Sequence, residues 1–307
     1  MKEEKKMRDL LEMESCQICP RECHVNRNLG ETGFCHMTKD LVVARAALHH
    51  WEEPCLSGTR GSGTVFFSGC AMGCVFCQNH TIAQGERGRT VSIERLSEIF
   101  LELQDKGAHN INLVTPSHYV PQMKIALELA LDLGLKIPVV FNSSGYEKVE
   151  TLKSLEGLVQ IYLPDFKYLE DTLALRYSNC KDYAIWAKPA IEEMVRQTGE
   201  PVFDEQGILL KGTIVRHLSL PGALSDSKDI LEYLSEKYGD KIYISIMNQY
   251  TPMDTLIGFE EIQRKVTKEE YDELMMYARF LKIRKAYIQE GESQSESFIP
   301  AFDEAGL

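Results

Sequence analysis

The chain has 307 residues, of which 44% are hydrophobic and 26% charged, and nine of them are cysteines. This composition is ordinary for a soluble globular protein, and no apolar run reaches the roughly 18 residues that a membrane span needs. The formal net charge of −12 argues against nucleic-acid binding, which requires a basic face. The charged N-terminus lacks the apolar segment of a signal peptide, so we expect a cytoplasmic protein with reduced cysteines and no membrane partner.

The first 60 residues form a cysteine-rich segment that ends in a glycine-rich turn, "SGTRGSG". Cys16, Cys19, Cys23 and Cys35 have the spacing C-x2-C-x3-C-x11-C. Four thiolates complete a tetrahedral zinc site, and they would equally complete a 4Fe–4S cluster that passes electrons to another centre. A loop without metal is the third alternative. Because the segment has little apolar material of its own, metal binding would supply folding energy. We therefore expect residues 1–60 to be a metal-binding extension.

A second group of cysteines follows the apolar run "TVFFS", which predicts a strand. Cys70, Cys74 and Cys77 have the spacing C-x3-C-x2-C, and no fourth cysteine lies nearby. Thiolates so placed can bind three irons of a 4Fe–4S cluster and leave the fourth iron open to a small molecule. The alternative is a zinc site completed by His80 or by a distant cysteine. The third cysteine and the preceding strand favour the cluster.

Beyond this loop, short apolar runs alternate with amphipathic segments. Ser92 is a suitable N-cap for a helix in which Leu96 and Phe100 share one face. The predicted strands cover residues 64–69, 110–114, 137–145, 158–167, 208–222 and 241–250, and residues 285–290 are extended. The predicted helices cover residues 93–103, 121–134, 146–155, 172–177, 183–197, 227–238 and 268–280.

Six buried strands that alternate with helices predict an α/β protein with a parallel sheet. A doubly wound sheet and a barrel both satisfy this pattern, but no G-x-G-x-x-G follows the first strand. Polar residues at the strand ends favour a partial (β/α)6 TIM-like barrel with its active site at the carboxyl ends of the strands. We assign this barrel to residues 61–290 and a C-terminal tail to residues 291–307.

The segment "CAMGCVFC", with Phe76 directly before its third cysteine, resembles the cluster loop of the radical S-adenosylmethionine (SAM) enzymes. The resemblance covers nearly the whole chain from Cys16 on. It is closest to an uncharacterised branch of proteins similar to pyruvate formate-lyase activating enzyme. It implies that the open iron chelates the amino and carboxylate groups of SAM and that one electron cleaves the sulfonium. The resulting 5′-deoxyadenosyl radical would abstract a hydrogen atom from a substrate that the protein holds in line.

Several strand ends match that family in kind. The resemblance of "FNSSG" implies that Asn142 and Ser143 contact SAM, with a helix cap as the alternative. The segment "YLPDFKY" resembles the family's Asp-x-Lys and places Asp165 and Lys167 at the barrel mouth, unless they only form a satisfied ion pair. The segment "VRHLSLPG" resembles the family's Arg-x4-Pro-Gly, which implies that Arg216 pairs with the cofactor carboxylate; a surface or interdomain salt bridge is the alternative.

Two segments depart from the family pattern. Residues 115–117 ("TPS") replace its Gly-Gly-Glu, so their carbonyls are the candidates to receive the SAM amino group. At the sixth strand "MNQY" replaces a histidine, which makes Gln249 the candidate cofactor contact. His118 could face the radical site as a proton relay or a substrate contact, or it could be a hydrogen-bonded loop histidine. The catalytic candidates are therefore His118, Asp165 and Lys167.

These residues predict a radical SAM oxidoreductase similar to the activating enzymes. Its substrate would be a glycine of a glycyl-radical enzyme, and its electron donor a protein such as flavodoxin or ferredoxin. Radical modification of a small molecule or an RNA is the second hypothesis, and the acidity disfavours RNA. A non-catalytic iron–sulfur or zinc protein is the third, but it would leave the polar strand ends without a purpose.

Overall fold

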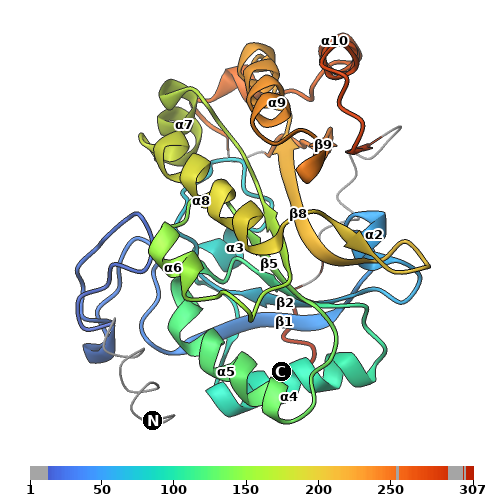
Figure 1. Ribbon diagram of the computed structural model, residues 1–307. Helices are drawn as coiled ribbons and strands as arrows, with labels where there is room; N and C mark the ends of the chain where they lie inside the picture. Colours follow the sequence, from blue (N-terminus) through green and yellow to red (C-terminus); the bar gives the residue numbers. More distant parts are fainter. Residues whose placement is uncertain (1–12, 254–255, 290–299, 301) are drawn as a thin grey trace.

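Parallel strands form the centre of the molecule in a computed structural model that describes residues 13–253, 256–289, 300 and 302–307 (Figure 1). In order across the sheet they are β2 (Ser62–Phe67), β4 (Ile111–Val114), β5 (Val139–Ser143), β6 (Ile161–Pro164), β8 (Leu209–Leu218), β9 (Tyr243–Met247) and β10 (Ala286–Ile288). The first six are the six predicted strands, and β10 lies within the segment predicted to be extended. The open, mostly parallel sheet confirms the predicted partial barrel.

The helices and turns that join the strands supply the crossovers that parallel pairing needs. They are α2 (Pro54–Ser57), α3 (His80–Ala83), α4 (Ile93–Asp105), α5 (Val120–Asp132), α6 (Val149–Lys153), α7 (Asp171–Ser178), α8 (Tyr183–Thr198), α9 (Leu224–Tyr238) and α10 (Lys268–Phe280), with the 3-10 turns η1 (Arg27–Leu29), η2 (Ser117–Tyr119), η3 (Gly239–Lys241) and η4 (Glu260–Ile262). Ser92 caps α4 as predicted, because its side chain accepts a hydrogen bond from the Arg95 amide. Within the described residues, no helix is long and apolar enough to cross a membrane.

Three strands that the sequence did not predict pair antiparallel with this sheet. β1 (Leu41–His49) pairs with β2, β3 (Arg89–Val91) pairs with β1, and β7 (Val202–Phe203) pairs with β8. Because β1 belongs to the sheet, the sheet begins before the boundary predicted at residue 60. The segment between β1 and β2 therefore lies against the barrel and can contribute to its interior.

The core lies on both sides of the strands. Figure 1 shows α4, α5 and α8 outside the strands, where buried side chains such as Phe100 and Met123 fill the space between helices and sheet. Inside the barrel, Cys55 and Leu56 of α2 pack against residues such as Ile161 and Leu209 at the beginning of their strands. The short helix α2 thus fills the amino-terminal end of the barrel and leaves the carboxyl-terminal end for a site.

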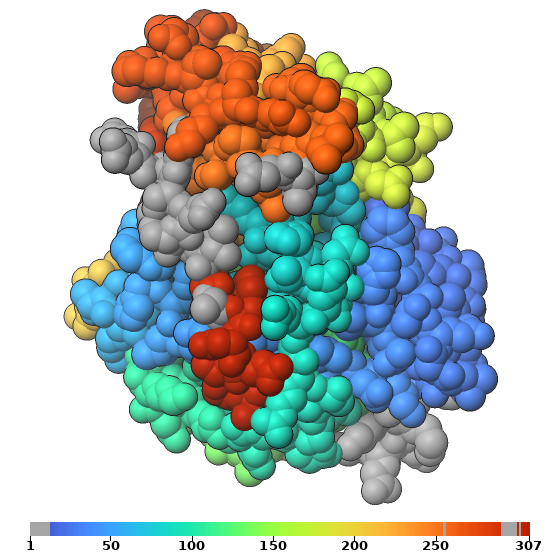
Figure 2. All heavy atoms as spheres, turned by 180° about the vertical axis from the view of Figure 1, so that it is seen from behind, coloured from blue at the N-terminus to red at the C-terminus, as the bar shows by residue number. Residues whose placement is uncertain are grey.

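Both ends of the described chain pack onto this framework. Arg21 of the cysteine-rich segment donates hydrogen bonds to the carbonyls of Ala71 and Asn179, each at 2.8 Å. At the C-terminus, the Ala46 amide of β1 donates to the Ala305 carbonyl at 2.9 Å. Figure 2 shows these C-terminal residues in red, lying on the surface between blue and teal segments. The described part of the predicted tail, residues 300 and 302–307, is therefore joined to β1 by backbone hydrogen bonds.

Candidate active site

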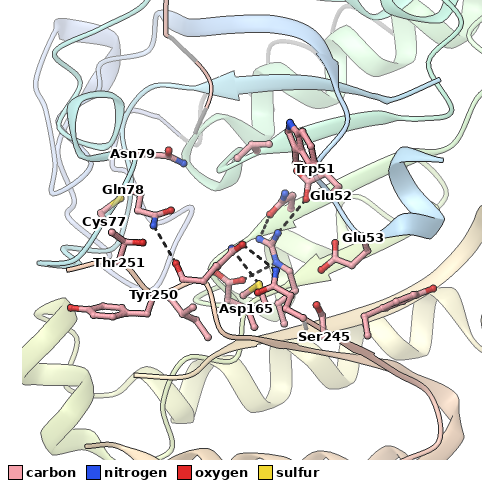
Figure 3. A pocket seen from close by; sticks show the side chains of 18 of the residues that line it. Trp51, Glu52, Glu53, Cys77, Gln78, Asn79, Asp165, Ser245, Tyr250 and Thr251 are labelled. Atoms are coloured by element: carbon pink, nitrogen blue, oxygen red, sulfur yellow. Dashed lines mark hydrogen bonds and ion pairs between the residues drawn. The ribbon is translucent and has the colours of Figure 1, made fainter. Parts of the chain in front are cut away.

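A cavity of about 450 Å³ lies at the carboxyl ends of the parallel strands (Figure 3). Its volume falls within the roughly 300–1,000 Å³ that is usual for small-molecule sites. The predicted site residues on its wall are Cys74, Cys77, Asn142, Asp165, Lys167, Arg216 and Gln249. They come from five separate segments of the chain, so the fold brings together side chains that lie up to 175 residues apart in the sequence.

The cysteine loop, residues 70–77, begins three residues after the end of β2 and is fixed by Gly69 and by α7. Gly69 has φ +88°, and a Cβ at this position would contact Met37 and lie 2.7 Å from the Cys35 carbonyl oxygen. A side chain would therefore displace the loop. Further along, the Val75 amide donates to the Tyr177 carbonyl at 2.9 Å, and the Ser178 hydroxyl donates to Cys74 Sγ at 2.9 Å. These contacts hold the thiols beside the cavity.

The chemistry of this donor set fits an iron–sulfur cluster. The thiols of the loop lie close enough to raise one another's pKa values. Burial is the larger cause: it raises the pKa of the Cys70 thiol and raises that of the Cys77 thiol to about 12. The Lys167 ammonium opposes these effects, so a cation lies near the loop. Across the residues that the structure describes, no three Cys, His, Asp or Glu side chains are arranged to hold a single metal ion. In a cluster each thiolate binds a different iron, so its ligands need not converge on one point.

A charged network forms the cavity wall next to the cysteines. Arg216 of β8 donates from Nε to Asp165 Oδ1 at 3.0 Å and from Nη2 to Asn142 Oδ1 at 2.7 Å. Lys167 Nζ donates to the other Asp165 oxygen at 2.6 Å. Burial alone would raise the pKa of Asp165, but Lys167 and Arg216 bring it below its ordinary value. Asp165 and Lys167 do form an ion pair, and this pair lies on the cavity wall with Arg216 rather than at the surface.

Ser143 and Gln249 occupy different positions relative to the cavity. Ser143 is buried, and its Oγ accepts a hydrogen bond from the Gly145 amide at 3.2 Å; it does not cap α6, whose N-cap is Lys148. Gln249 lies on the cavity wall, where Gln289 Nε2 donates to its Oε1 at 3.1 Å. The polar strand ends therefore divide into residues that line the cavity and residues that fix the adjoining turns.

His118 does not line the cavity, which corrects the expectation that it faces the reaction site. The 3-10 turn η2 directs its ring toward β2, and Nε2 lies 2.7 Å from the Ser68 carbonyl oxygen. Burial, with the nearby charge of Arg27, lowers the pKa of His118 to about 3. The imidazole is therefore neutral at physiological pH, and its contacts are those of a hydrogen-bonded loop histidine.

An acidic pair that the sequence did not predict lies on the same wall. Glu52 accepts hydrogen bonds from Asn112 Nδ2 at 3.1 Å and from Arg216 Nη1 at 3.4 Å. Glu53 lies beside it, directly before Pro54 at the start of α2. An extended apolar run followed by two acidic residues and a proline at a helix start was the available signal. Without β1 in the predicted sheet, that signal could not be placed inside the barrel.

The N-terminal cysteines lie close to one another, and the Cys35 carbonyl lies next to Gly69, directly before the cysteine loop. Cys16, Cys19 and Cys35 are buried, and Cys23 is half-buried. Burial raises the pKa of Cys19 to about 12, and the neighbouring thiols of Cys16 and Cys35 add to the shift. The described residues include no arrangement of these thiols suited to one metal ion. Their metal therefore stays a prediction from spacing.

The similarity to known proteins extends over most of the chain. A family model described as the radical SAM superfamily matches residues 64–184, which include the cysteine loop, Asp165 and Lys167. Uncharacterized protein MJ0674 of Methanocaldococcus jannaschii is 30% identical over 272 residues, which cover 86% of this chain and 74% of that protein. The chain belongs to the radical SAM superfamily. Membership implies a 4Fe–4S cluster and SAM, and the three thiols of the cysteine loop are suited to hold such a cluster.

Two solved structures match part of the chain. SuiB of Streptococcus suis bound to S-adenosylmethionine has a TM-score of 0.48 and 14% identity, over 73% of this chain and 49% of that chain. The FeFe-hydrogenase maturase HydG from Carboxydothermus hydrogenoformans has a TM-score of 0.47 and 14% identity, over 75% of this chain and 53% of that chain. The present chain thus spans about half the length of these two proteins.

Proposed function

We propose that this radical SAM protein cleaves SAM reductively at a cluster held by Cys70, Cys74 and Cys77, and abstracts hydrogen from a substrate in the cavity. The observation that carries this proposal is the position of the three-cysteine loop, two of whose thiols line a cavity at the carboxyl ends of the strands. When bound, the cluster supplies the electron that cleaves the sulfonium of SAM. Every other part of the reaction depends on how the chain holds its reactants.

The charged wall can perform this positioning. Lys167 brings a positive charge near thiolates that would carry negative charge as iron ligands, Arg216 adds a second positive charge to the same wall, and Asp165 fixes both side chains. Because the side chains of all three are only 17% exposed, their electrostatic interactions are screened less than those at the surface. We propose that Asn142 and Gln249, which lie on the same wall, supply hydrogen bonds to the cofactor.

For the substrate, we propose the Cα hydrogen of a glycine in a glycyl-radical enzyme. The support is the resemblance of the segments around Asp165, Lys167 and Arg216 to those of the activating enzymes. A cytoplasmic flavodoxin or ferredoxin would donate the electron. Radical modification of a small molecule is the alternative, and the net charge of −12 weighs against RNA. A glycyl-radical electron paramagnetic resonance (EPR) signal in a co-incubated partner would distinguish glycine abstraction from the alternative.

The test of SAM cleavage is the formation of 5′-deoxyadenosine by anaerobically reconstituted, dithionite-reduced protein. We expect product from the native protein, none from Cys74→Ala, and product from Cys55→Ala, whose sulfur is buried in the barrel floor. The absence of product from native protein shown to hold a complete cluster, together with failure to bind SAM, would refute the proposal.

For the N-terminal segment, we propose a structural zinc ion or a second 4Fe–4S cluster bound by Cys16, Cys19, Cys23 and Cys35. Four thiolates suit either group. Metal analysis of the Cys16→Ser variant distinguishes the two, since it should lose either zinc or about four irons relative to the native protein. Unchanged zinc and iron contents would show that the segment binds neither.

A further inference from the structure

Glu53 is a buried carboxylate that the protein leaves incompletely paired. It lines the cavity and is 8% exposed, and its Oε2 has no hydrogen-bond partner among the residues that the structure describes. Figure 3 shows Glu53 at one end of the cavity and Cys77 at the other, with Asp165 between them. A buried carboxylate is costly unless it is paired with a cation or fully hydrogen-bonded. Its position therefore points to a ligand group that completes its contacts.

The charges on the cavity wall leave one carboxylate without a cation of its own. Within the described part of the chain, the Asp, Glu, Lys and Arg side chains that line the cavity are Glu52, Glu53, Asp165, Lys167 and Arg216. Three are acidic and two are basic, so the wall carries one excess negative charge when all are ionised. Both basic side chains are directed to Asp165, and Arg216 also reaches Glu52 at 3.4 Å. Among the described residues no ion pair joins Glu53 directly to this network; burial raises the pKa of Glu53, and the nearby charge of Arg216 opposes that rise only in part.

Aromatic side chains accompany this acidic pair. Trp51 lines the cavity on the same segment as Glu52 and Glu53. Tyr287 of β10 also lines the cavity and stacks on Tyr243, with ring centroids 5.3 Å apart. Carboxylates and aromatic faces both attract cations, and amines and guanidinium groups satisfy both kinds of contact.

We propose that Glu53, with Glu52 beside it, binds a cationic amine or guanidinium group of the substrate. This inference rests on the proposed function and specifies its substrate class. The reacting carbon–hydrogen bond would lie toward Cys77, and the cationic group would lie at the opposite end of the cavity. A free amine and a Lys or Arg side chain of a peptide both present this chemistry.

The test uses two probes that are nearly equal in shape, n-butylguanidinium and uncharged n-butylurea. Calorimetry on reconstituted, SAM-bound native protein should give a dissociation constant at least tenfold lower for n-butylguanidinium. Glu53→Gln keeps the size of the side chain and removes its charge, so this preference should disappear. Glu53→Asp, which keeps the charge, should retain part of it. Glu205→Gln changes an exposed carboxylate on the turn between β7 and β8 and should retain all of it.

Two peptide probes identify the source of the cation. If acetyl-Gly-Arg-Gly-amide binds more tightly than n-butylguanidinium, and its citrulline analogue does not, the cation is that of a peptide side chain. The reverse order supports a small amine.

Three results would overturn the inference: equal affinity of the native protein for n-butylguanidinium and n-butylurea, binding of neither probe, or a preference that survives in Glu53→Gln. Weakened SAM binding in Glu53→Gln, with no change in probe preference, would also overturn it by assigning the carboxylate to the cofactor. Because probe binding requires no SAM cleavage, failure of the proposed reaction would be seen separately in the 5′-deoxyadenosine assay.

Discussion

Replacing Asp165 by Asn tests whether the charged wall depends on its central carboxylate. The substitution removes the counter-ion of Lys167 and Arg216, which contact the two oxygens of Asp165 at 2.6 and 3.0 Å. Removing one member of a buried ion pair costs about 3–5 kcal/mol, because a buried charge remains unpaired. Arg216 keeps its contacts with Glu52 and Asn142. We therefore expect the free energy of unfolding to fall by about 3 kcal/mol, at the lower end of this range.

The assay is urea unfolding of the metal-free protein at pH 7 under reducing conditions. The matched control is Glu273→Gln, which breaks an ion pair with Lys228 whose side chains are 27% and 52% exposed. Exposed pairs contribute at most about 1 kcal/mol, so this variant should unfold close to the native midpoint. A loss below about 1 kcal/mol for Asp165→Asn, or equal losses in the two variants, would refute the reasoning.

Other predictions concern pH and the cysteine loop. Burial lowers the pKa of His217 from 6.5 to about 4, so its contribution to stability is present above pH 6.5 and is lost as the pH falls toward 4. The free energy of unfolding lost in this way is about 3 kcal/mol. Urea midpoints should therefore fall less between pH 7 and pH 4.5 in His217→Gln than in the native protein. Equal falls of the midpoint in the two proteins would contradict the assignment. Gly69→Ala should lower stability and cluster content much more than Gly134→Ala, since both positions have positive φ but a Cβ at Gly134 meets nothing within 4 Å. Native cluster content in Gly69→Ala would show that the loop tolerates the displacement.

The sequence predicted those features that local pattern determines. The alternation of apolar runs and amphipathic segments gave the six parallel strands, because a buried strand and an amphipathic helix have different periodicities. Ser92 marked the start of α4, because an N-cap acts within a few residues. Cys74, Cys77, Asp165 and Arg216 could be placed near one cavity because the carboxyl ends of parallel strands share one side of a sheet.

Features that depend on distant contacts could not be predicted in this way. β1 acquires its place through pairing with β2 and β3, and Glu52 reaches the cavity only because of that pairing. His118 follows a predicted strand, but the orientation of its ring is set by the turn η2 and by Ser68, 50 residues earlier in the chain. Proximity to a strand end therefore did not determine which side chains line the cavity.

The central claim is that the loop containing Cys70, Cys74 and Cys77 holds a cluster whose open iron binds SAM at the cavity. EPR spectroscopy of the reduced, reconstituted protein with and without SAM tests it most directly. We expect SAM to change the cluster spectrum in the native protein and in Cys55→Ala, and we expect Cys74→Ala to lose this SAM-sensitive signal. A spectrum of fully loaded native protein that SAM leaves unchanged, or a SAM-dependent change that survives in Cys74→Ala, would contradict the claim.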